Sequence, residues 1–168
     1  MALDLYILRH GIAVDADAQS PSDFDRALTP EGEKKVRCIA KAIRTMGLSF
    51  DLILSSPYVR ARETAEIVAT TLAAHKKLAL RDSLGVEENP RELIAELTGL
   101  TPAPESLLLV GHEPFLSTLV SFLITGTAKP CITLKKGGLC KLTVEKLRVG
   151  RCATLDWLLT PRQLLLMT

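Results

Sequence analysis

The run from Leu5 to Gly11 (LYILRHG) constrains the fold more than any other stretch of the chain. A short apolar segment that ends in a cation, an imidazole and a glycine predicts a buried strand, because most helices are longer. Open α/β sheets place their ligand crevices at the carboxyl ends of strands, so we expect Arg9, His10 and Gly11 there. A histidine in that place can be a nucleophile, a general base, a metal ligand or a structural residue held by hydrogen bonds.

A second buried strand is expected at Asp51–Ser55, and a helix follows it. Ser56 is suited to cap this helix and Pro57 to occupy its first position. Arg60 lies in the first turn, close to the strand end and to the free N–H groups that attract anions. Arg62 is about 200° further around the helix, so we expect Arg60 to face the crevice and Arg62 the solvent.

The third buried strand, Ser106–Val110, again ends in a glycine and a histidine, Gly111 and His112. Three strand ends therefore bring two histidines and at least two arginines to one edge of a sheet. Guanidinium groups match phosphate oxygens, and a neutral imidazole can attack phosphorus. A zinc site would need at least a third protein ligand, so we predict neither a metal nor a cofactor.

Two loops contribute further candidates. The polar segment 12–28 is long enough to be functional, and its Arg26 is either a partner for the neighbouring aspartates or a cation at the pocket rim. Glu87 and Glu88 are either solvated loop acids or a carboxylate pair in a crevice loop. The segment from Thr29 to Glu33 is a typical helix start, with a threonine cap followed by proline and acidic residues.

The overall composition narrows the class of protein. The 168 residues suit one domain, residues 1–168, and the net charge of +2 argues against a nucleic-acid or membrane surface. The four cysteines form no CxxC pair and have no zinc-like spacing, so we expect them to be small hydrophobic residues in a reducing cytosol. The N-terminus lacks the pattern of a signal peptide, so we expect a cytoplasmic protein. Near the C-terminus, two alternating runs around Arg148–Gly150 predict an antiparallel hairpin.

Four motifs together resemble the histidine phosphatase superfamily, also called phosphoglycerate-mutase-like. Arg9-His10-Gly11 resembles its signature, and Leu28–Gly32 (LTPEG) resembles its LTxxG helix start. The segment Ser56–Ala65 (SPYVRARETA) is similar to its SPxxRAxxTA motif, and Gly111-His112 corresponds to its second catalytic histidine. In overall length and in its compact middle region, the chain is most similar to the SixA-type branch, the phosphohistidine phosphatases.

The resemblance implies a three-layer α/β/α domain with a mostly parallel sheet and a phosphoenzyme mechanism without metal. His10 would attack phosphorus, while Arg9, Arg60 and His112 would hold the phosphoryl oxygens. Arg26 and Gly11 are further candidates for substrate binding. Mutase-like members carry a glutamate acid in the middle loop, which makes Glu87 and Glu88 candidates for a general acid.

The expected reaction is removal of a phosphoryl group from a protein phosphohistidine. A small-molecule phosphomonoesterase is the alternative enzyme, and a phospho-ligand-binding module without turnover is the alternative from another class. An imidazole leaving group can itself take a proton near neutral pH, whereas an alkoxide needs a positioned acid. The leading expectation is therefore a phosphohistidine-containing protein as the partner, with a small phosphorylated substrate as the second.

Overall fold

A six-stranded mixed sheet forms the centre of the molecule. The computed structural model describes residues 2–17 and 22–168. The strand order is β3-β2-β4-β1-β5-β6, in which β1 to β4 are parallel, β5 is antiparallel to β1, and β6 is antiparallel to β5. The strands are β1 (Leu3–Arg9), β2 (Leu52–Ser55), β3 (Leu78–Leu80), β4 (Ser106–Gly111), β5 (Leu139–Val144) and β6 (Ala153–Leu159).

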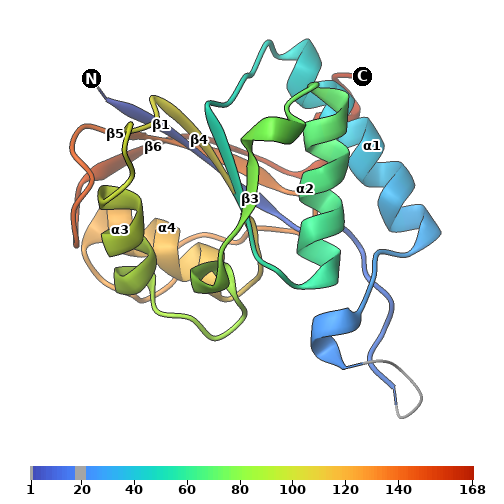
Figure 1. Cartoon of the computed structure of the whole chain (residues 1–168), viewed down its shortest axis with the longest axis horizontal. Coiled ribbons are helices and arrows are strands. Elements are labelled where there is room, and N and C mark those ends of the chain that lie inside the picture. The colour runs from blue at the N-terminus through green and yellow to red at the C-terminus, as the bar shows by residue number, and fades with distance from the viewer. Residues whose placement is uncertain (1, 18–21) are drawn as a thin grey trace.

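Helices cover both faces of this sheet (Figure 1). On one face, α1, α2 and α5 share a buried cluster with the sheet, and on the other α3 and α4 do so. The helices are α1 (Pro30–Thr45), α2 (Val59–Thr71), α3 (Pro90–Thr98), α4 (Phe115–Thr125) and α5 (Pro161–Leu165). The predicted three-layer α/β/α fold, with a mostly parallel sheet and a C-terminal antiparallel hairpin, is confirmed.

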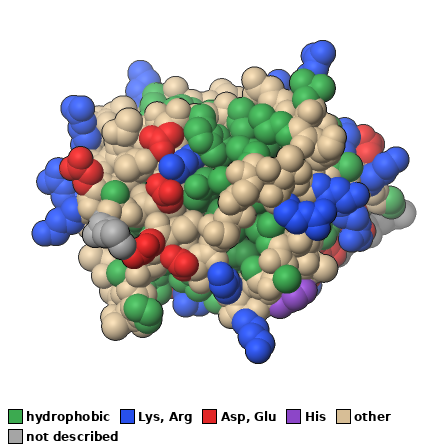
Figure 2. Space-filling model, turned by 90° about the horizontal axis from the view of Figure 1, so that it is seen from above, with side chains coloured by type: hydrophobic (Ala, Val, Ile, Leu, Met, Phe, Trp, Pro, Cys, Tyr) green, Lys and Arg blue, Asp and Glu red, His purple; other side chains and the backbone are tan. Residues whose placement is uncertain are grey.

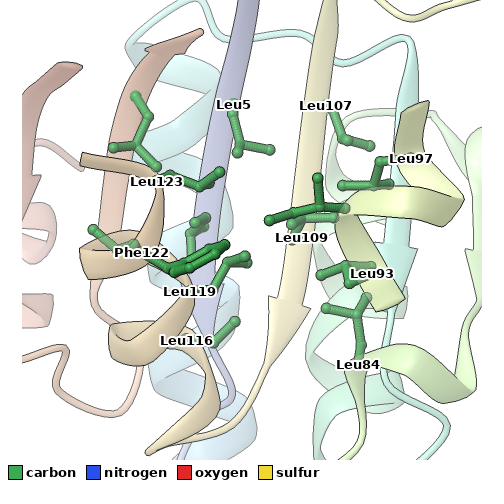
Figure 3. Packing of buried hydrophobic residues seen from close by; sticks show 14 of the residues in the cluster. Leu5, Leu84, Leu93, Leu97, Leu107, Leu109, Leu116, Leu119, Phe122 and Leu123 are labelled. Carbon is green, nitrogen blue, oxygen red and sulfur yellow. The ribbon is translucent and has the colours of Figure 1, made fainter. Parts of the chain in front are cut away.

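The side-chain alternation of β1 explains the two layers. Leu5 and Ile7 point to the α3 and α4 face, whereas Tyr6 and Leu8 point to the α1 and α2 face. All four are buried, as expected for a central strand of a sheet covered on both sides. Figure 3 shows the α3 and α4 layer, where leucines of both helices pack onto leucines of β1 and β4.

The observed helix starts agree only in part with those predicted from the sequence. α1 begins as predicted, because the Thr29 hydroxyl accepts a hydrogen bond from the Gly32 N–H and Pro30 occupies the first turn. The predicted start of α2 at Ser56 is wrong: the helix begins at Val59 without a side-chain cap. The Ser56 hydroxyl instead bonds the ring of His112. The short α5 was not predicted, although Thr160 and Gln163 form a capping box there.

The start of α1 also anchors the loop that precedes it. The Thr29 N–H donates to the Ile12 carbonyl, and Ala13 pairs with Leu28 in an isolated bridge. A Cβ built on Gly32 would lie 2.1 Å from the Ile12 carbonyl oxygen. Only glycine allows this close approach, so Gly32 fixes the segment after Gly11 against the helix.

Charged side chains of both signs surround a hydrophobic area on the face shown in Figure 2. This mixed distribution agrees with the small net charge of the chain. Among the residues that the structure describes, no helix has the length and apolar character needed to cross a bilayer.

Candidate active site

The carboxyl ends of β1, β2 and β4 bring the predicted residues together. These three strands are neighbours and run parallel, so their ends meet at one edge of the sheet. His10 follows β1, His112 follows β4, and Arg60 lies in the first turn of α2, after β2. The two imidazole rings are 5.1 Å apart between centroids, and both side chains are buried.

The orientation of the His10 ring is set by its own neighbour. Nδ1 lies 2.7 Å from the Gly11 carbonyl oxygen, which can only accept, so Nδ1 carries the proton and Nε2 keeps a free lone pair. The Gly11 N–H donates to the Thr64 hydroxyl, which in turn donates to the Arg60 carbonyl. α2 therefore holds the backbone on which the His10 ring depends.

The electrostatic environment keeps His10 neutral. Burial lowers its pKa to about 3, and the nearby His112, Arg60 and Arg9 act in the same direction, while the Gly11 hydrogen bond opposes them. His10 is 5 % exposed. At neutral pH the ring is therefore an uncharged base with an available Nε2, which is the form that a nucleophile needs.

His112 is the more deeply buried of the two, at 1 % exposure. Its Nε2 lies 2.7 Å from the Ser56 hydroxyl, and the Tyr58 ring packs edge-on at 5.0 Å. Burial, together with Arg60 and Arg9, lowers its pKa to about 3. Its Nδ1 is buried and has no hydrogen-bond partner among the described residues, so one ring atom is left for a ligand to satisfy.

The Arg9 side chain is held by a residue that is distant in sequence. Its guanidinium donates to the Leu134 carbonyl at 3.1 Å, and its buried Nε has no partner among the residues described. Burial lowers the pKa of Arg9, and the Glu113 carboxylate opposes this shift. Arg9 thus has donor capacity that the protein does not use.

Arg60 is buried, and the loop before α1 covers it. Its guanidinium donates to the Asp23 carbonyl at 2.6 Å and to the Asp23 carboxylate at 3.2 Å. It also lies over the Tyr58 ring, which contacts the Phe24 ring of the same loop. Arg62, in contrast, lies 3.6 Å from Glu66 through its Nε and is partly exposed.

Arg26 lies in the same loop, where sequence reasoning left two alternatives. Its guanidinium pairs with the Asp23 carboxylate at 2.7 Å, and its Nε donates to the Val14 carbonyl. Arg26 therefore has the geometry of an ion-pair partner for an aspartate, the first of the two alternatives. Burial alone would raise the pKa of Asp23, but hydrogen bonds and charge from Arg26 and Arg60 lower it overall. This carboxyl is therefore ionised at neutral pH.

Glu87 and Glu88 lie in the loop before α3. No hydrogen bond or ion pair joins either carboxylate to His10 or His112 in the described part of the chain. The Glu88 side chain instead lies against Gly85 in its own loop. Gly11 is placed by close packing, since an added Cβ would lie 2.5 Å from the Val36 side chain.

Sequence reasoning missed several residues that hold this site. Ser56 and Thr64 were visible as members of the SPxxRAxxTA motif, but no pattern assigned them a partner. Asp23 had no signal, because it is one of several aspartates in a loop without periodicity. Across the described residues, no three His, Cys, Asp or Glu side chains are grouped so that they could hold a metal ion.

The family model of the histidine phosphatase superfamily (branch 1) matches residues 5–97. An uncharacterized protein of Picosynechococcus is 38% identical over 153 residues, 88% of each chain. Together with the site geometry, these matches show that the chain belongs to the histidine phosphatase superfamily, and that it is a phosphatase of this group.

Within the superfamily, the chain belongs to the SixA-type branch. Phosphohistidine phosphatase SixA of Escherichia coli is 27% identical over 160 residues, 95% of this chain and 94% of that protein. A solved structure of the protein histidine phosphatase SixA complexed with tungstate superposes with a TM-score of 0.84 at 26% identity. That comparison covers 96% of this chain and 99% of the other.

Proposed function

We propose that this phosphatase hydrolyses phosphohistidine in proteins through a covalent intermediate on His10. The observation that carries the proposal is the 2.7 Å contact between Nδ1 of His10 and the Gly11 carbonyl oxygen. It leaves Nε2 unprotonated, and the lowered pKa keeps the ring neutral at physiological pH. Proteins similar to this one carry the name phosphohistidine phosphatase, which supports the same substrate class.

The reaction proceeds in two displacements. The Nε2 lone pair of His10 attacks phosphorus, and the P–N bond of the substrate breaks with its electron pair left on the departing imidazole, which takes a proton from water. A water molecule then attacks the phosphoenzyme, loses its proton to solvent, and breaks the bond between phosphorus and Nε2. The products are inorganic phosphate and the regenerated neutral ring.

Arg9, Arg60 and His112 would stabilise the charge that spreads over the phosphoryl oxygens. Among the described residues, the buried Nε of Arg9 and the buried Nδ1 of His112 have no hydrogen-bond partner. Such donors are worth more in a buried site than in water. Arg60 reaches the same edge but is shared with Asp23, so its contribution depends on the position of the loop before α1.

The acids near the site support the same substrate class. A phosphate ester needs a general acid to protonate its leaving alkoxide, a contribution of ~10²–10⁴-fold. Asp23 has a lowered pKa and is ionised, and within the described residues no hydrogen bond or ion pair links Glu87 or Glu88 to the histidines. A departing imidazole accepts its own proton near neutral pH, so the site suits a phosphoramidate better than an ester.

The test is to trap the intermediate. Wild-type protein is mixed with a protein carrying ³²P-phosphohistidine and quenched rapidly without acid, because phosphohistidine is acid-labile. Label is expected on wild type and on the surface control His75→Ala, and none on His10→Ala. Arg60→Ala should label more slowly by about 10²–10³-fold, by analogy with the loss of an oxyanion donor. Label on His10→Ala would place the nucleophile elsewhere.

A parallel comparison of kcat/KM separates the alternatives. We expect a protein phosphohistidine to exceed 3-phosphoglycerate and sugar phosphates. Efficient turnover of a sugar phosphate with phosphohistidine left untouched would establish a small-molecule phosphomonoesterase instead. Binding of phosphorylated protein without turnover or label would establish a binding module.

A further inference from the structure

A cleft of about 630 Å³ lies beside the strand end that carries the nucleophile, and its lining residues other than Arg9 and Gly11 have no role in the reaction described above. Arg9 and Gly11, the two chain neighbours of His10, contribute to its lining. Its other walls are α1, the segment 135–137 and the start of α5. Figure 1 shows the C-terminal end of the chain next to α1, in agreement with the contacts between α5 and α1. The cleft is therefore continuous with the strand end that carries His10.

The floor of the cleft is apolar. Val36 and Ile39 of α1 line it from one side, and Leu165 of α5 from the other. Pockets for small metabolites place a few fixed polar groups among apolar ones to orient the ligand. Here Val36, Ile39 and Leu165 give an apolar floor, and apart from Arg9 the charged lining residues stand at the rim, which suits the apolar face of a helix better than a polar metabolite.

The rim of the cleft is cationic. Lys135, Lys136 and Arg162 line it, and all three are exposed. Lys35 also lies there but pairs with Glu31 at 2.8 Å. In the described part of the chain, no ion pair joins Lys135, Lys136 or Arg162 to an acid. Their charges are thus available to a partner, in a chain whose net charge is only +2.

The basic segment is tied to the catalytic backbone. The Gly137 N–H donates to the carbonyls of Arg9 and His10, and the Arg9 N–H donates to the Gly138 carbonyl. A Cβ on Gly137 would lie 2.6 Å from the Ile39 side chain. Lys135 and Lys136 therefore stand at a fixed place relative to the nucleophile.

We propose that this cleft docks the substrate protein, through an amphipathic helix whose apolar face enters the floor and whose acidic side chains meet Lys135, Lys136 and Arg162. The inference rests on the proposed function, since the docked helix carries the phosphohistidine. Charge complementarity selects an acidic partner, and the apolar floor selects a helix face over a free anion.

The experiment uses two synthetic helical peptides with one phosphohistidine and the same apolar pattern, one flanked by glutamates and the other by lysines. Wild type should prefer the acidic peptide in kcat/KM by at least about tenfold at low salt, and 0.5 M salt should reduce the preference. The variant K135E/K136E/R162E should lose it, while its kcat/KM on free phosphohistidine stays within about twofold of wild type.

Two controls keep the outcome specific. The variant K76E/K129E/K146E carries the same change of charge on residues outside the cleft and should keep the preference. Leu165→Ser should raise KM for the acidic peptide without changing hydrolysis of free phosphohistidine. Equal rates on both peptides with wild type, or a preference that survives K135E/K136E/R162E, would overturn the proposal.

Two further outcomes are informative. Wild type could instead favour neither peptide but hydrolyse a carboxylated aryl phosphate preferentially. If K135E/K136E/R162E abolishes that preference, the cleft binds a small molecule and the proposal is wrong. If wild type leaves both phosphohistidine peptides and free phosphohistidine intact, the proposed function fails on its own. The cleft is then tested by whether the unphosphorylated acidic peptide inhibits para-nitrophenyl phosphate hydrolysis competitively in wild type, and absence of inhibition would refute docking.

Discussion

Two buried neutral histidines should make the stability of this protein depend steeply on mild acid. The pKa of His10 and that of His112 are each lowered to about 3, against about 6.5 for an unperturbed histidine. Below pH 6.5 the unfolded chain therefore binds protons that the folded chain does not. The free energy of unfolding must then fall as the pH falls through 6.5 and towards 3.

The magnitude follows from these two values. Lowering the pH from 7.5 to 5.5 reduces the free energy of unfolding by about 1.4 kcal/mol for each such histidine, and so by about 3 kcal/mol for the pair. This is a large part of the ~5–15 kcal/mol that stabilises a typical domain. The lowered pKa of Asp23 acts only at lower pH, below its ordinary value of 3.8, and so outside this window.

Urea unfolding followed by circular dichroism at intervals of 0.5 pH unit would measure the effect. His10→Gln and His112→Gln should each remove about half of the pH dependence, whatever they do to stability at pH 7.5. His75→Gln, at the exposed short helix before β3, controls for the loss of a histidine as such. A wild-type free energy that stays constant between pH 7.5 and 5.5 would refute the burial of two neutral rings.

Three further results are expected. Asp23→Asn should lower the inhibition constant of tungstate several-fold, because it removes the negative charge that is bonded to Arg60 and competes with the anion. An unchanged or higher constant would mean that Asp23 only positions the guanidinium. Gly32→Ala should cost about 1–3 kcal/mol in urea unfolding, because its Cβ meets the Ile12 carbonyl oxygen, and unchanged stability would show that the loop simply moves. Activity should survive exhaustive chelation and be inhibited by vanadate, whereas loss on chelation that zinc or manganese restores would require a metal.

Local patterns in the sequence predicted the buried strands and their ends well, whereas the three-layer arrangement was implied by the resemblance to the histidine phosphatase superfamily. The run before Arg9 is short and apolar, and the central strand it forms is buried on both faces. The convergence of His10 and His112 followed from neighbouring parallel strands, and that of Arg60 from its place in the first turn of the helix after β2.

What the sequence could not predict depends on contacts between distant side chains. Ser56 was assigned to a helix cap by its position before Pro57, but in the fold its hydroxyl lies closer to His112 than to any helical N–H. Asp23 covers Arg60 from a loop whose aspartates look alike in sequence. The cleft lies between α1, α5 and the segment before β5. No local sequence pattern indicates that these three parts of the chain are neighbours.

The hydrogen bonds between residues 9–10 and the segment before β5 have a consequence for synthesis. His10 is synthesised before β4 and β5, with which its strand pairs, before Leu134, whose carbonyl accepts from the Arg9 guanidinium, and before Gly137, whose N–H donates to the carbonyls of Arg9 and His10. A nascent chain that has reached only residue 100 lacks all of these partners. The nucleophile is thus made early and becomes competent late, so partly synthesised chains should carry no phosphatase activity, and formation of the site should be a slow, long-range step of folding.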